Sequence, residues 1–321
     1  MNIGIMGAGT IAHIMAETII KSGIANMYAI ASRSIEKAQD FADKHNIPKA
    51  YGSYEELTKD SDIDLIYIAT PHSRHFEDCM LCIENGRNVL CEKAFTANAQ
   101  QAKKVLSYAK EKNVFITEAI WPRYIPMRAV LDDILASGII GEVSSLTANL
   151  GYDLSGLDRL QLPELAGGAL LDLGVYALNF ASMAFGNDIE EIKSTCTLNK
   201  YGVDMNNSII LKYKDGKTAL LHSNFNAKTD RMGIIYGSKG RIEFTNISNC
   251  EKLRVILNND EVIDYPVPPQ VSGYEYEVIS SLKAIKENKL ECDEMPHSET
   301  IFIMELMDSL RKEWGVKYPF E

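Results

Sequence analysis

Three side chains in this sequence have the types and spacing that acid–base chemistry requires. Lys93 lies in Cys91–Ala94, where a short apolar run ends, and it could polarise a hydroxyl or lower the pKa of a neighbouring acid. Asp172 and Tyr176 are four residues apart in an apolar segment, so on a helix they project from one face. Each also has a structural interpretation: Lys93 as a solvated surface residue, Asp172 as a helix-dipole partner, and Tyr176 as a core residue.

The N-terminus contains a turn suited to a dinucleotide, Gly7-Ala8-Gly9, between the apolar run Asn2–Met6 and a helical pattern. Gly7 permits the tight turn, Gly9 lets the backbone approach a pyrophosphate at the helix N-terminus, and Ala12 lets the helix pack close to the sheet. Glycine-rich turns also follow ordinary strands, so the motif alone is weak evidence. The cofactor-binding residues predicted here are Gly7, Gly9, Thr10, Ile11 and Ala12.

The segment Ala31-Ser32-Arg33-Ser34 follows the second strand pattern, where an NAD-specific unit places Asp or Glu against the ribose hydroxyls. Here a guanidinium stands between two hydroxyls instead, and this arrangement suits a 2′-phosphate. We therefore expect Ser32, Arg33 and Ser34 to bind NADP, although NAD remains possible. Alternatively, Ser32 and Ser34 cap the next helix and Arg33 is solvated, which leaves the choice of cofactor open.

A later strand pattern ends in Thr70-Pro71-His72-Ser73-Arg74-His75. In an open α/β sheet the ligand lies at the carboxyl ends of the strands. We therefore expect the cofactor crevice to be lined by Thr70, Pro71, His72 and His75. The two histidines have no third ligand nearby in the sequence, so turn and helix-start roles are favoured over a metal site, and no metal is expected.

The composition favours a small-molecule partner. The chain has 321 residues, with 33 basic and 44 acidic side chains and a net charge of −11, which argues against nucleic acid and anionic membranes as partners. We see no apolar stretch approaching the ~20 residues of a membrane span, and we expect a cytoplasmic protein. The six scattered cysteines suit buried thiols rather than a disulfide framework.

Through about Phe115, apolar strands alternate with amphipathic helices, which is typical of a parallel sheet covered on both faces. The predicted strands are Asn2–Met6, Met27–Ala31, Leu65–Ala69, Asn88–Cys91 and Val114–Ala119. The predicted helices are Ile11–Ser22, Ile35–His45, His75–Glu84 and Asn98–Lys112. We therefore expect an α/β fold in which residues 1–118 form a dinucleotide-binding Rossmann domain.

The second half predicts a different domain, with a helix that ends at Ser137, a long apolar helix from about Gly168 to Phe185, and a set of strands separated by turns. Asp215-Gly216 is a strong two-residue hairpin signal, and Asn258-Asn259-Asp260 marks another turn. The predicted strands are Ser208–Tyr213, Lys217–Asn224, Gly233–Tyr236 and Arg241–Phe244, and the closing helices are Tyr274–Glu287 and Ser298–Trp314. We expect residues 119–321 to form an α+β domain on a largely antiparallel open sheet, for substrate binding and dimerisation.

Four motifs together resemble the glucose-fructose oxidoreductase/inositol dehydrogenase/MocA (Gfo/Idh/MocA) family, and their order spans nearly the whole chain. They are Gly7-x-Gly9-x-x-Ala12, Glu92-Lys93, Glu118-Ala119-Ile120-Trp121-x-Arg123, and Gly167 through Tyr176. Within this family, the third motif and the tyrosine that closes the fourth most resemble the dimeric dihydrodiol dehydrogenase and NADP-dependent D-xylose dehydrogenase branches.

The resemblance implies a role for each residue of the candidate site. Lys93 and Tyr176 would form the acid/base pair, and Asp172 would orient the substrate or the lysine. An unperturbed tyrosine has a pKa of about 10, so a neighbouring ammonium is the simplest way to favour the phenolate. The resemblance also implies that Trp121 and Arg123 line the cofactor and substrate cleft, and that Glu92 contacts the cofactor.

One position departs from the family, which usually has Glu-Lys-Pro where this chain has Glu92-Lys93-Ala94. A proline can fix the lysine backbone through a cis bond. Ala94 implies either a trans bond with a shifted Lys93 or a strained local geometry.

The sequence thus predicts an NAD(P)-dependent oxidoreductase, with NADP favoured. The expected substrate is a secondary alcohol or carbonyl of a sugar, cyclic polyol or dihydrodiol, and the expected assembly is a homodimer or higher homo-oligomer. Two alternatives stay open. One is an NADP(H)-binding sensor without turnover; the other is an enzyme that performs a redox-neutral hydrolysis with transient hydride transfer.

Overall fold

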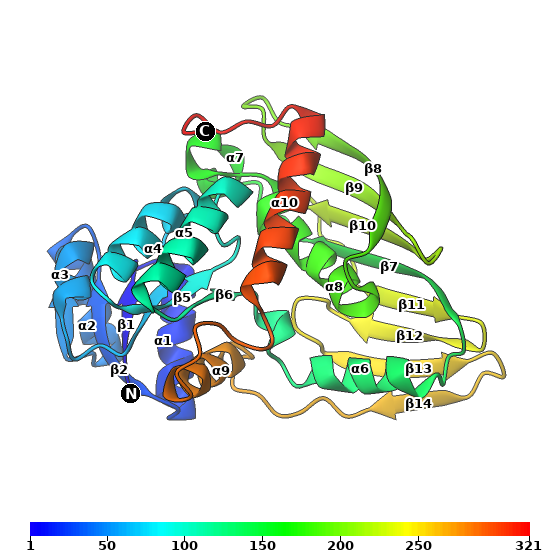
Figure 1. The fold of residues 1–321 in the computed structure, drawn as a ribbon, viewed down its shortest axis with the longest axis horizontal. Coiled ribbons are helices and arrows are strands. Elements are labelled where there is room, and N and C mark those ends of the chain that lie inside the picture. Colours follow the sequence, from blue (N-terminus) through cyan, green and yellow to red (C-terminus); the bar gives the residue numbers. More distant parts are fainter. The chain divides into compact units, whose positions relative to one another are not determined.

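The computed structural model describes all residues from Met1 to Glu321 and divides into two compact units. Unit 1 contains Met1–Tyr124 and Gln270–Met304, and unit 2 contains Ile125–Pro269 and Glu305–Glu321 (Figure 1). The sequence-based division into 1–118 and 119–321 used two continuous segments, whereas each compact unit combines two separate segments of chain.

Unit 1 contains a six-stranded parallel sheet in the order β3-β2-β1-β4-β5-β6. The strands are β1 (Asn2–Met6), β2 (Asn26–Ala31), β3 (Lys49–Tyr51), β4 (Leu65–Ile68), β5 (Asn88–Glu92) and β6 (Ile116–Ala119). The central strands are buried on both faces, as their continuous apolar runs require. The predicted Rossmann sheet is confirmed.

Helices cover both faces of this sheet. On one face, α1 (Thr10–Ser22) packs against α2 (Ile35–His45) and α9 (Glu275–Lys286). On the other, α4 (His75–Glu84) packs against α3 (Tyr54–Lys59) and α5 (Ala99–Lys112). The sequence prediction missed β3 and α3, because elements of three and six residues are too short to show a period.

Unit 2 contains an eight-stranded sheet in the order β14-β13-β12-β11-β7-β10-β9-β8. Every neighbouring pair is antiparallel except β7 and β10, so the predicted, largely antiparallel sheet is confirmed. The strands are β7 (Val143–Gly151), β8 (Ile189–Leu198), β9 (Asp204–Tyr213), β10 (Thr218–Asn224), β11 (Gly233–Gly237), β12 (Gly240–Thr245), β13 (Lys252–Leu257) and β14 (Val262–Tyr265). The strands named from the sequence did not include β7 and β8, and β13 and β14 were predicted only through the turn that joins them.

Both predicted hairpins are present. Asp215-Gly216 joins β9 to β10, and Gly216 has a positive φ of 89° that a side chain would oppose. Asn258-Asn259-Asp260 connects β13 to β14. These turns fix the register, so alternate residues of β9 face opposite sides of the sheet.

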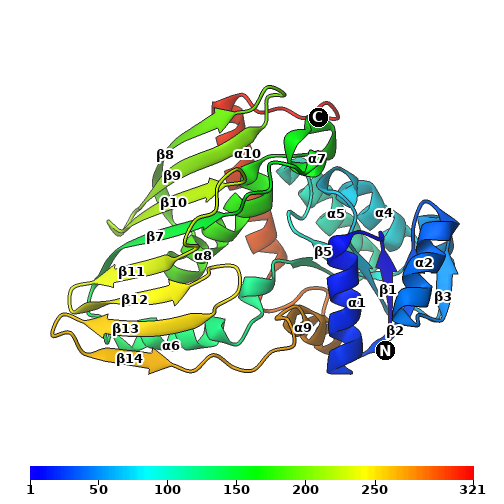
Figure 2. The ribbon, with the colours of Figure 1, turned by 180° about the vertical axis from the view of Figure 1, so that it is seen from behind.

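One face of the unit 2 sheet carries helices and the other is open. The helix α8 (Val175–Phe185) packs on β7 and β10 and against α6 (Met127–Ser137). The remaining helices are the short α7 (Asp158–Gln161) and α10 (His297–Trp314), whose second part belongs to this unit. Figure 2 shows the opposite face of the sheet, without helices over it.

The predicted helix Gly168–Phe185 needs two corrections. It begins as a π-helical turn, Leu170–Gly174, before α8 continues in the α form. The segment Pro163–Phe185 is also long and apolar enough to span a membrane by composition, with a mean hydropathy of 1.3, contrary to the expectation that no stretch approaches this length. Because 78% of that apolar window is buried inside the structure, it forms the core helix of unit 2.

Candidate active site

The turn after β1 has the geometry that a dinucleotide requires. Gly7 has a φ of 103°, and a Cβ atom at this position would lie 2.9 Å from the carbonyl oxygen of Ala69. Gly9 is exposed, and a Cβ there would have no protein atom within 4 Å. Ala12 is fully buried against the sheet. The turn therefore fits a pyrophosphate beside Gly9, and the predicted roles of the two glycines agree with their surroundings.

The N-terminus of α1 is also suited to an anion. Its cap residue Gly9 offers no side-chain hydrogen bond, and the first turn carries no acidic residue. By contrast, the side chains of Ser34, Ser53 and Asn98 cap α2, α3 and α5. The first-turn amides of α1 are thus left for a phosphate, which the helix dipole also favours.

The end of β2 combines a cap with an exposed cation. Ser34 Oγ accepts a hydrogen bond from the Lys37 amide at 3.3 Å and donates one to Glu36 at 2.6 Å, so this hydroxyl has the capping role of the alternative interpretation. Ser32 is buried, whereas Arg33 is exposed. Contact of Ser32, Arg33 and Ser34 with a cofactor phosphate stays a prediction, and Arg33 is the best placed of the three.

Two histidines hold the backbone that carries Lys93. Nε2 of His72 lies 3.1 Å from the Lys93 carbonyl oxygen. His75 is completely buried, with Nδ1 2.8 Å from the carbonyl oxygen of Ala94 and Nε2 2.8 Å from that of Thr70. Burial lowers the pKa of His75 despite the two carbonyl groups. The Lys93–Ala94 peptide bond is cis, as the family's proline would permit.

Unit 1 contains three buried carboxyl groups close to the segment that carries Lys93: those of Glu92, Glu118 and Glu277. Glu92 accepts hydrogen bonds from the Tyr67 hydroxyl and, at 3.2 Å, from the Lys93 amide. Glu277 on α9 is fully buried, and burial, together with the nearby charge of Glu92, raises its pKa well above the usual value. Burial likewise raises the pKa of Glu118 to about 7. Glu92 is therefore part of the internal structure of unit 1, and its predicted contact with a cofactor stays untested.

Trp121 and Arg123 follow β6 and are both nearly buried. Trp121 stacks on Tyr274 with a ring separation of 4.2 Å, and Arg123 forms an ion pair with Glu299 at 2.8 Å. Only 5% of the Arg123 side chain is exposed. These contacts tie the end of β6 to the segment Gln270–Met304, while contact with a cofactor or substrate stays a prediction for both residues.

In unit 2, Asp172 lies in the π-helical turn and forms an ion pair with Arg159 on α7. The two guanidinium nitrogens of Arg159 lie 2.9 and 3.4 Å from the carboxylate oxygens of Asp172. Asp172 is buried, so this pairing offsets the cost of removing a charge from water. Tyr176 lies in the first turn of α8 and is 7% exposed. The carboxylate of Asp172 is thus paired with an arginine on another helix, which the sequence prediction missed.

Asp204 on β9 fixes the start of the π-helical turn. Its Oδ2 accepts hydrogen bonds from the Leu170 amide and from the Asn207 side chain, both at 2.8 Å. Gly168 has a φ of 123°, and a Cβ at this position would lie 2.3 Å from Asp204 Oδ1. The backbone that delivers Asp172 therefore requires both glycine at 168 and a buried carboxyl group at 204.

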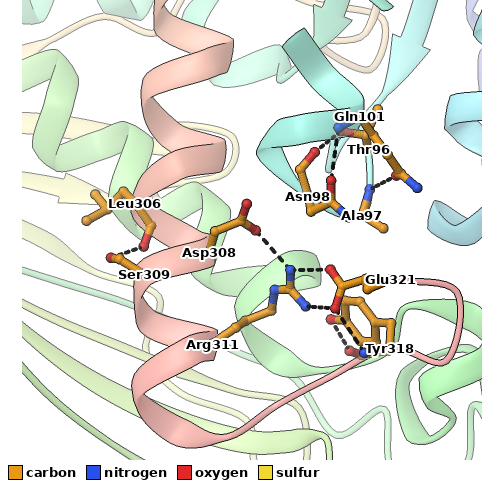
Figure 3. A network of polar contacts seen from close by, with 11 residues as sticks. Thr96, Ala97, Asn98, Gln101, Leu306, Asp308, Ser309, Arg311, Tyr318 and Glu321 are labelled. Carbon is orange, nitrogen blue, oxygen red and sulfur yellow. Dashed lines mark hydrogen bonds and ion pairs between the residues drawn. The ribbon is translucent and has the colours of Figure 1, made fainter. Parts of the chain in front are cut away.

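The C-terminal segment contacts Gly167, which together with Gly168 forms the glycine pair before the π-helical turn. The Tyr318 hydroxyl donates a hydrogen bond to the Gly167 carbonyl oxygen at 2.8 Å. Arg311 on α10 forms ion pairs with Glu321 and Asp308, and it packs over the Tyr318 ring (Figure 3). The last residues of the chain thus help to hold the turn that precedes Asp172.

Asp204 predicts a pH-dependent stability. Burial raises its pKa from 3.8 to about 7, so in this range the folded state binds a proton that the unfolded chain has released. The resulting stabilisation is complete below about pH 4 and is lost as the pH rises through 7. Urea unfolding at pH 5 and at pH 8 should show that the wild-type protein is less stable at pH 8. In Asp204→Asn this loss of stability should be smaller but not zero, because the raised pKa of Glu118 has the same effect on stability. An equal loss in both proteins would contradict this assignment.

Within unit 1, the structure brings the dinucleotide turn, the Thr70–His75 segment and the Lys93 backbone to one edge of the sheet. Within unit 2, it places Asp172 and Tyr176 in one continuous helical segment. The sequence prediction did not identify the supporting residues Tyr67, Arg159, Asp204, Glu277 and Tyr318. None of these gave a local signal; the strand that carries Asp204 was predicted to begin only at Ser208.

A Rossmann unit whose glycine turn fits a pyrophosphate, in one chain with an α+β unit whose core helical segment carries an aspartate and a tyrosine, is the arrangement expected of a nicotinamide-dependent oxidoreductase. Residues 1–119 match the family described as "Oxidoreductase family, NAD-binding Rossmann fold", and residues 129–243 match the "GFO/IDH/MocA C-terminal domain". The chain belongs to the Gfo/Idh/MocA family of oxidoreductases, and the resemblance inferred from the four motifs is confirmed.

Two curated relatives are similar over nearly the whole chain. Trans-1,2-dihydrobenzene-1,2-diol dehydrogenase of Xenopus tropicalis is 35% identical over 329 residues, covering 98% of each chain. D-xylose 1-dehydrogenase (NADP(+)) of Hypocrea jecorina is 36% identical over 365 residues, covering 98% of this chain and 92% of that protein. Among solved structures, KijD10, a 3-ketoreductase from Actinomadura kijaniata in complex with NADP and TDP-benzene, superposes with a TM-score of 0.88. It covers 97% of each chain at 23% identity and shows the shared fold.

Proposed function

We propose that this protein is an NADP-dependent dehydrogenase that oxidises a ring hydroxyl of a neutral sugar or dihydrodiol. The observation that carries the proposal is the presence of Lys93, Asp172 and Tyr176 at matching motif positions. They occur in a chain about 35% identical over 98% of its length to a dihydrodiol dehydrogenase and a xylose dehydrogenase. The dihydrodiol and D-xylose named in these relatives are the first substrates to test.

The residues of this chain supply binding and proton handling. The α1 N-terminus and Gly9 would hold the pyrophosphate, and the bound cofactor supplies the hydride acceptor. We propose that Tyr176 takes the proton from the substrate hydroxyl as a phenolate and returns it in the reverse direction. The ammonium of Lys93, whose backbone His72 fixes, favours that phenolate, and Asp172 orients the substrate by accepting a hydroxyl hydrogen bond.

Arg33 supports NADP over NAD in this proposal. It is exposed at the carboxyl end of β2, where the chain has no carboxylate for a ribose hydroxyl. A guanidinium–phosphate hydrogen bond is worth roughly 1.5–3 kcal/mol, so Arg33→Ala is expected to weaken NADPH binding about 10- to 100-fold. NADH binding should change little. Fluorescence titration of both cofactors checks this, and parallel losses for the two would rule out a phosphate contact.

The function itself is tested by following nicotinamide absorbance with NADP⁺ and, separately, with NAD⁺. The panel contains D-xylose, other aldopyranoses, cyclic polyols and an aromatic trans-dihydrodiol. Reduction of NADP⁺ by a sugar or by the dihydrodiol is the expected result. Binding of NADPH without turnover of any substrate in the panel would instead favour a cofactor sensor.

We also propose that two copies associate through the open face of the unit 2 sheet. Ile210, Leu220, Thr147 and Ile234 lie side by side on the adjacent strands β9, β10, β7 and β11. Ile210 and Leu220 are each 46% exposed, although both are large apolar residues. Sedimentation equilibrium should show a dimer that Leu220→Glu weakens, whereas a wild-type monomer would contradict the proposal.

A further inference from the structure

The ion pair between Arg159 and Asp172 joins a partly exposed guanidinium to a buried carboxylate, as the pair Arg74–Asp78 also does. The Asp172 side chain is 4% exposed, whereas that of Arg159 is 45% exposed. In the pairs Arg123–Glu299 and Arg311–Glu321 the guanidinium is the buried partner, with 5% exposure in each case. Arg159 therefore presents a charged group to solvent directly beside the buried carboxylate of the candidate site.

The position of Arg159 is fixed by its neighbours in unit 2. The next residue, Leu160, is fully buried, and its carbonyl oxygen accepts a hydrogen bond from the Gly168 amide at 3.0 Å. A Cβ at Gly167 would lie 2.7 Å from the same oxygen. The short helix α7 is thus packed against the glycine pair that leads to Asp172. This packing fixes the backbone that carries Arg159, and the ion pair with Asp172 directs its guanidinium.

The guanidinium has hydrogen-bonding capacity that the protein does not use. Arginine carries five N–H groups in a planar fork, and Arg159 directs two of them to Asp172. The structure shows no other hydrogen bond or ion pair for this side chain. Three N–H groups thus remain available to a ligand that also contacts Asp172.

We propose that Arg159 is a substrate-recognition residue that, with Asp172, selects neutral cyclic vicinal diols. Asp172 accepts a hydrogen bond from one hydroxyl, and Arg159 donates one to the oxygen of the hydroxyl next to the reacting carbon. The carboxylate already neutralises the guanidinium, so the pair offers one acceptor and one donor without net charge, which complements a diol better than an anion. The inference rests on the proposed dehydrogenase function and specifies its substrate class.

The test compares D-xylose with its 2-deoxy analogue, which lacks the hydroxyl next to the anomeric carbon. Arg159→Ala should lower kcat/KM for D-xylose about 10- to 100-fold and for the 2-deoxy sugar less than about 3-fold. The matched control is Arg128→Ala, which removes the partly exposed ion pair of Arg128 with Asp132 on α6 and should change neither value. Equal losses on both sugars would show that Arg159 is only a counter-ion for Asp172, and no loss on either would exclude any role.

A binding measurement separates this inference from the function. Saturation-transfer NMR with the NADPH-loaded protein reports sugar binding without turnover. Wild type that binds D-xylose more tightly than its 2-deoxy analogue, with this preference abolished in Arg159→Ala, would support recognition by Arg159. If the same wild-type protein oxidises neither sugar, the proposed reaction fails while recognition by Arg159 holds. If wild type shows no such preference, the inference fails. Faster turnover of D-glucuronate than of D-glucose would contradict the assignment to neutral diols.

Discussion

Replacing Tyr176 with phenylalanine is expected to lower turnover about 10²- to 10⁴-fold, the usual contribution of a general acid or base. The substitution removes one hydroxyl from a ring that is 7% exposed and leaves the packing of α8 unchanged. The Rossmann unit that binds the cofactor is not altered. The affinity for NADPH should therefore match that of wild type, and the loss should lie in kcat.

Steady-state kinetics with the best substrate and fluorescence titration of NADPH measure the two effects separately. Tyr213→Phe is the matched control, because Tyr213 is a buried tyrosine of the same unit whose hydroxyl has no hydrogen-bond partner. This control should retain wild-type turnover. If Tyr176→Phe also retained wild-type turnover, Tyr176 would not be the proton-transfer group.

Replacing Gly168 with alanine is expected to destabilise the protein by about 2–6 kcal/mol, as backbone strain and overpacking add. At a φ of 123°, a side chain is strongly disfavoured. The new Cβ would also lie 2.3 Å from Asp204 Oδ1. Asp204 cannot move away without breaking its hydrogen bonds to Leu170 and Asn207. Turnover should fall as well, because the disturbed turn carries Asp172.

Urea unfolding followed by circular dichroism measures this loss, with Gly186→Ala as the control. Gly186 ends α8 with a φ of 75°, but a Cβ there has no neighbour within 4 Å. This control should therefore lose only the backbone term, about 1–3 kcal/mol, without the added cost of overpacking. Equal losses for the two substitutions would show that contact with Asp204 does not constrain position 168.

Most of the fold could be predicted from the sequence, because its elements have strong periods and caps. The strand Asn2–Met6 and the helix Ile35–His45 were predicted with the residue bounds that the structure shows. The π-helical turn at Leu170–Gly174 could not be predicted, because tertiary hydrogen bonds to Asp204 define its start. The packing of Gln270–Met304 into unit 1 likewise depends on long-range contacts, such as that of Arg123 with Glu299.

The candidate site was only partly predictable for the same reason. The glycine turn, Lys93 and the Asp172–Tyr176 pair have local patterns, so spacing alone singled them out. The partners that fix them are distant in sequence: Arg159 is 13 residues from Asp172, and His72 is 21 residues from Lys93. Nothing in the local pattern around Arg159 or Glu277 marks them, because their significance arises from burial and from neighbours on other elements.

Direct hydride transfer to the cofactor is the central claim, and isotope labelling tests it most directly. D-xylose, or whichever substrate of the panel reduces NADP⁺, is labelled with deuterium at the reacting carbon, and the NADPH formed is analysed by mass spectrometry. We expect the deuterium to appear in the NADPH, and to appear about 10²- to 10⁴-fold more slowly when Tyr176→Phe replaces wild type under single-turnover conditions. NADPH that contains only solvent hydrogen, or no NADPH from any labelled substrate, would contradict the assignment of this protein as a dehydrogenase.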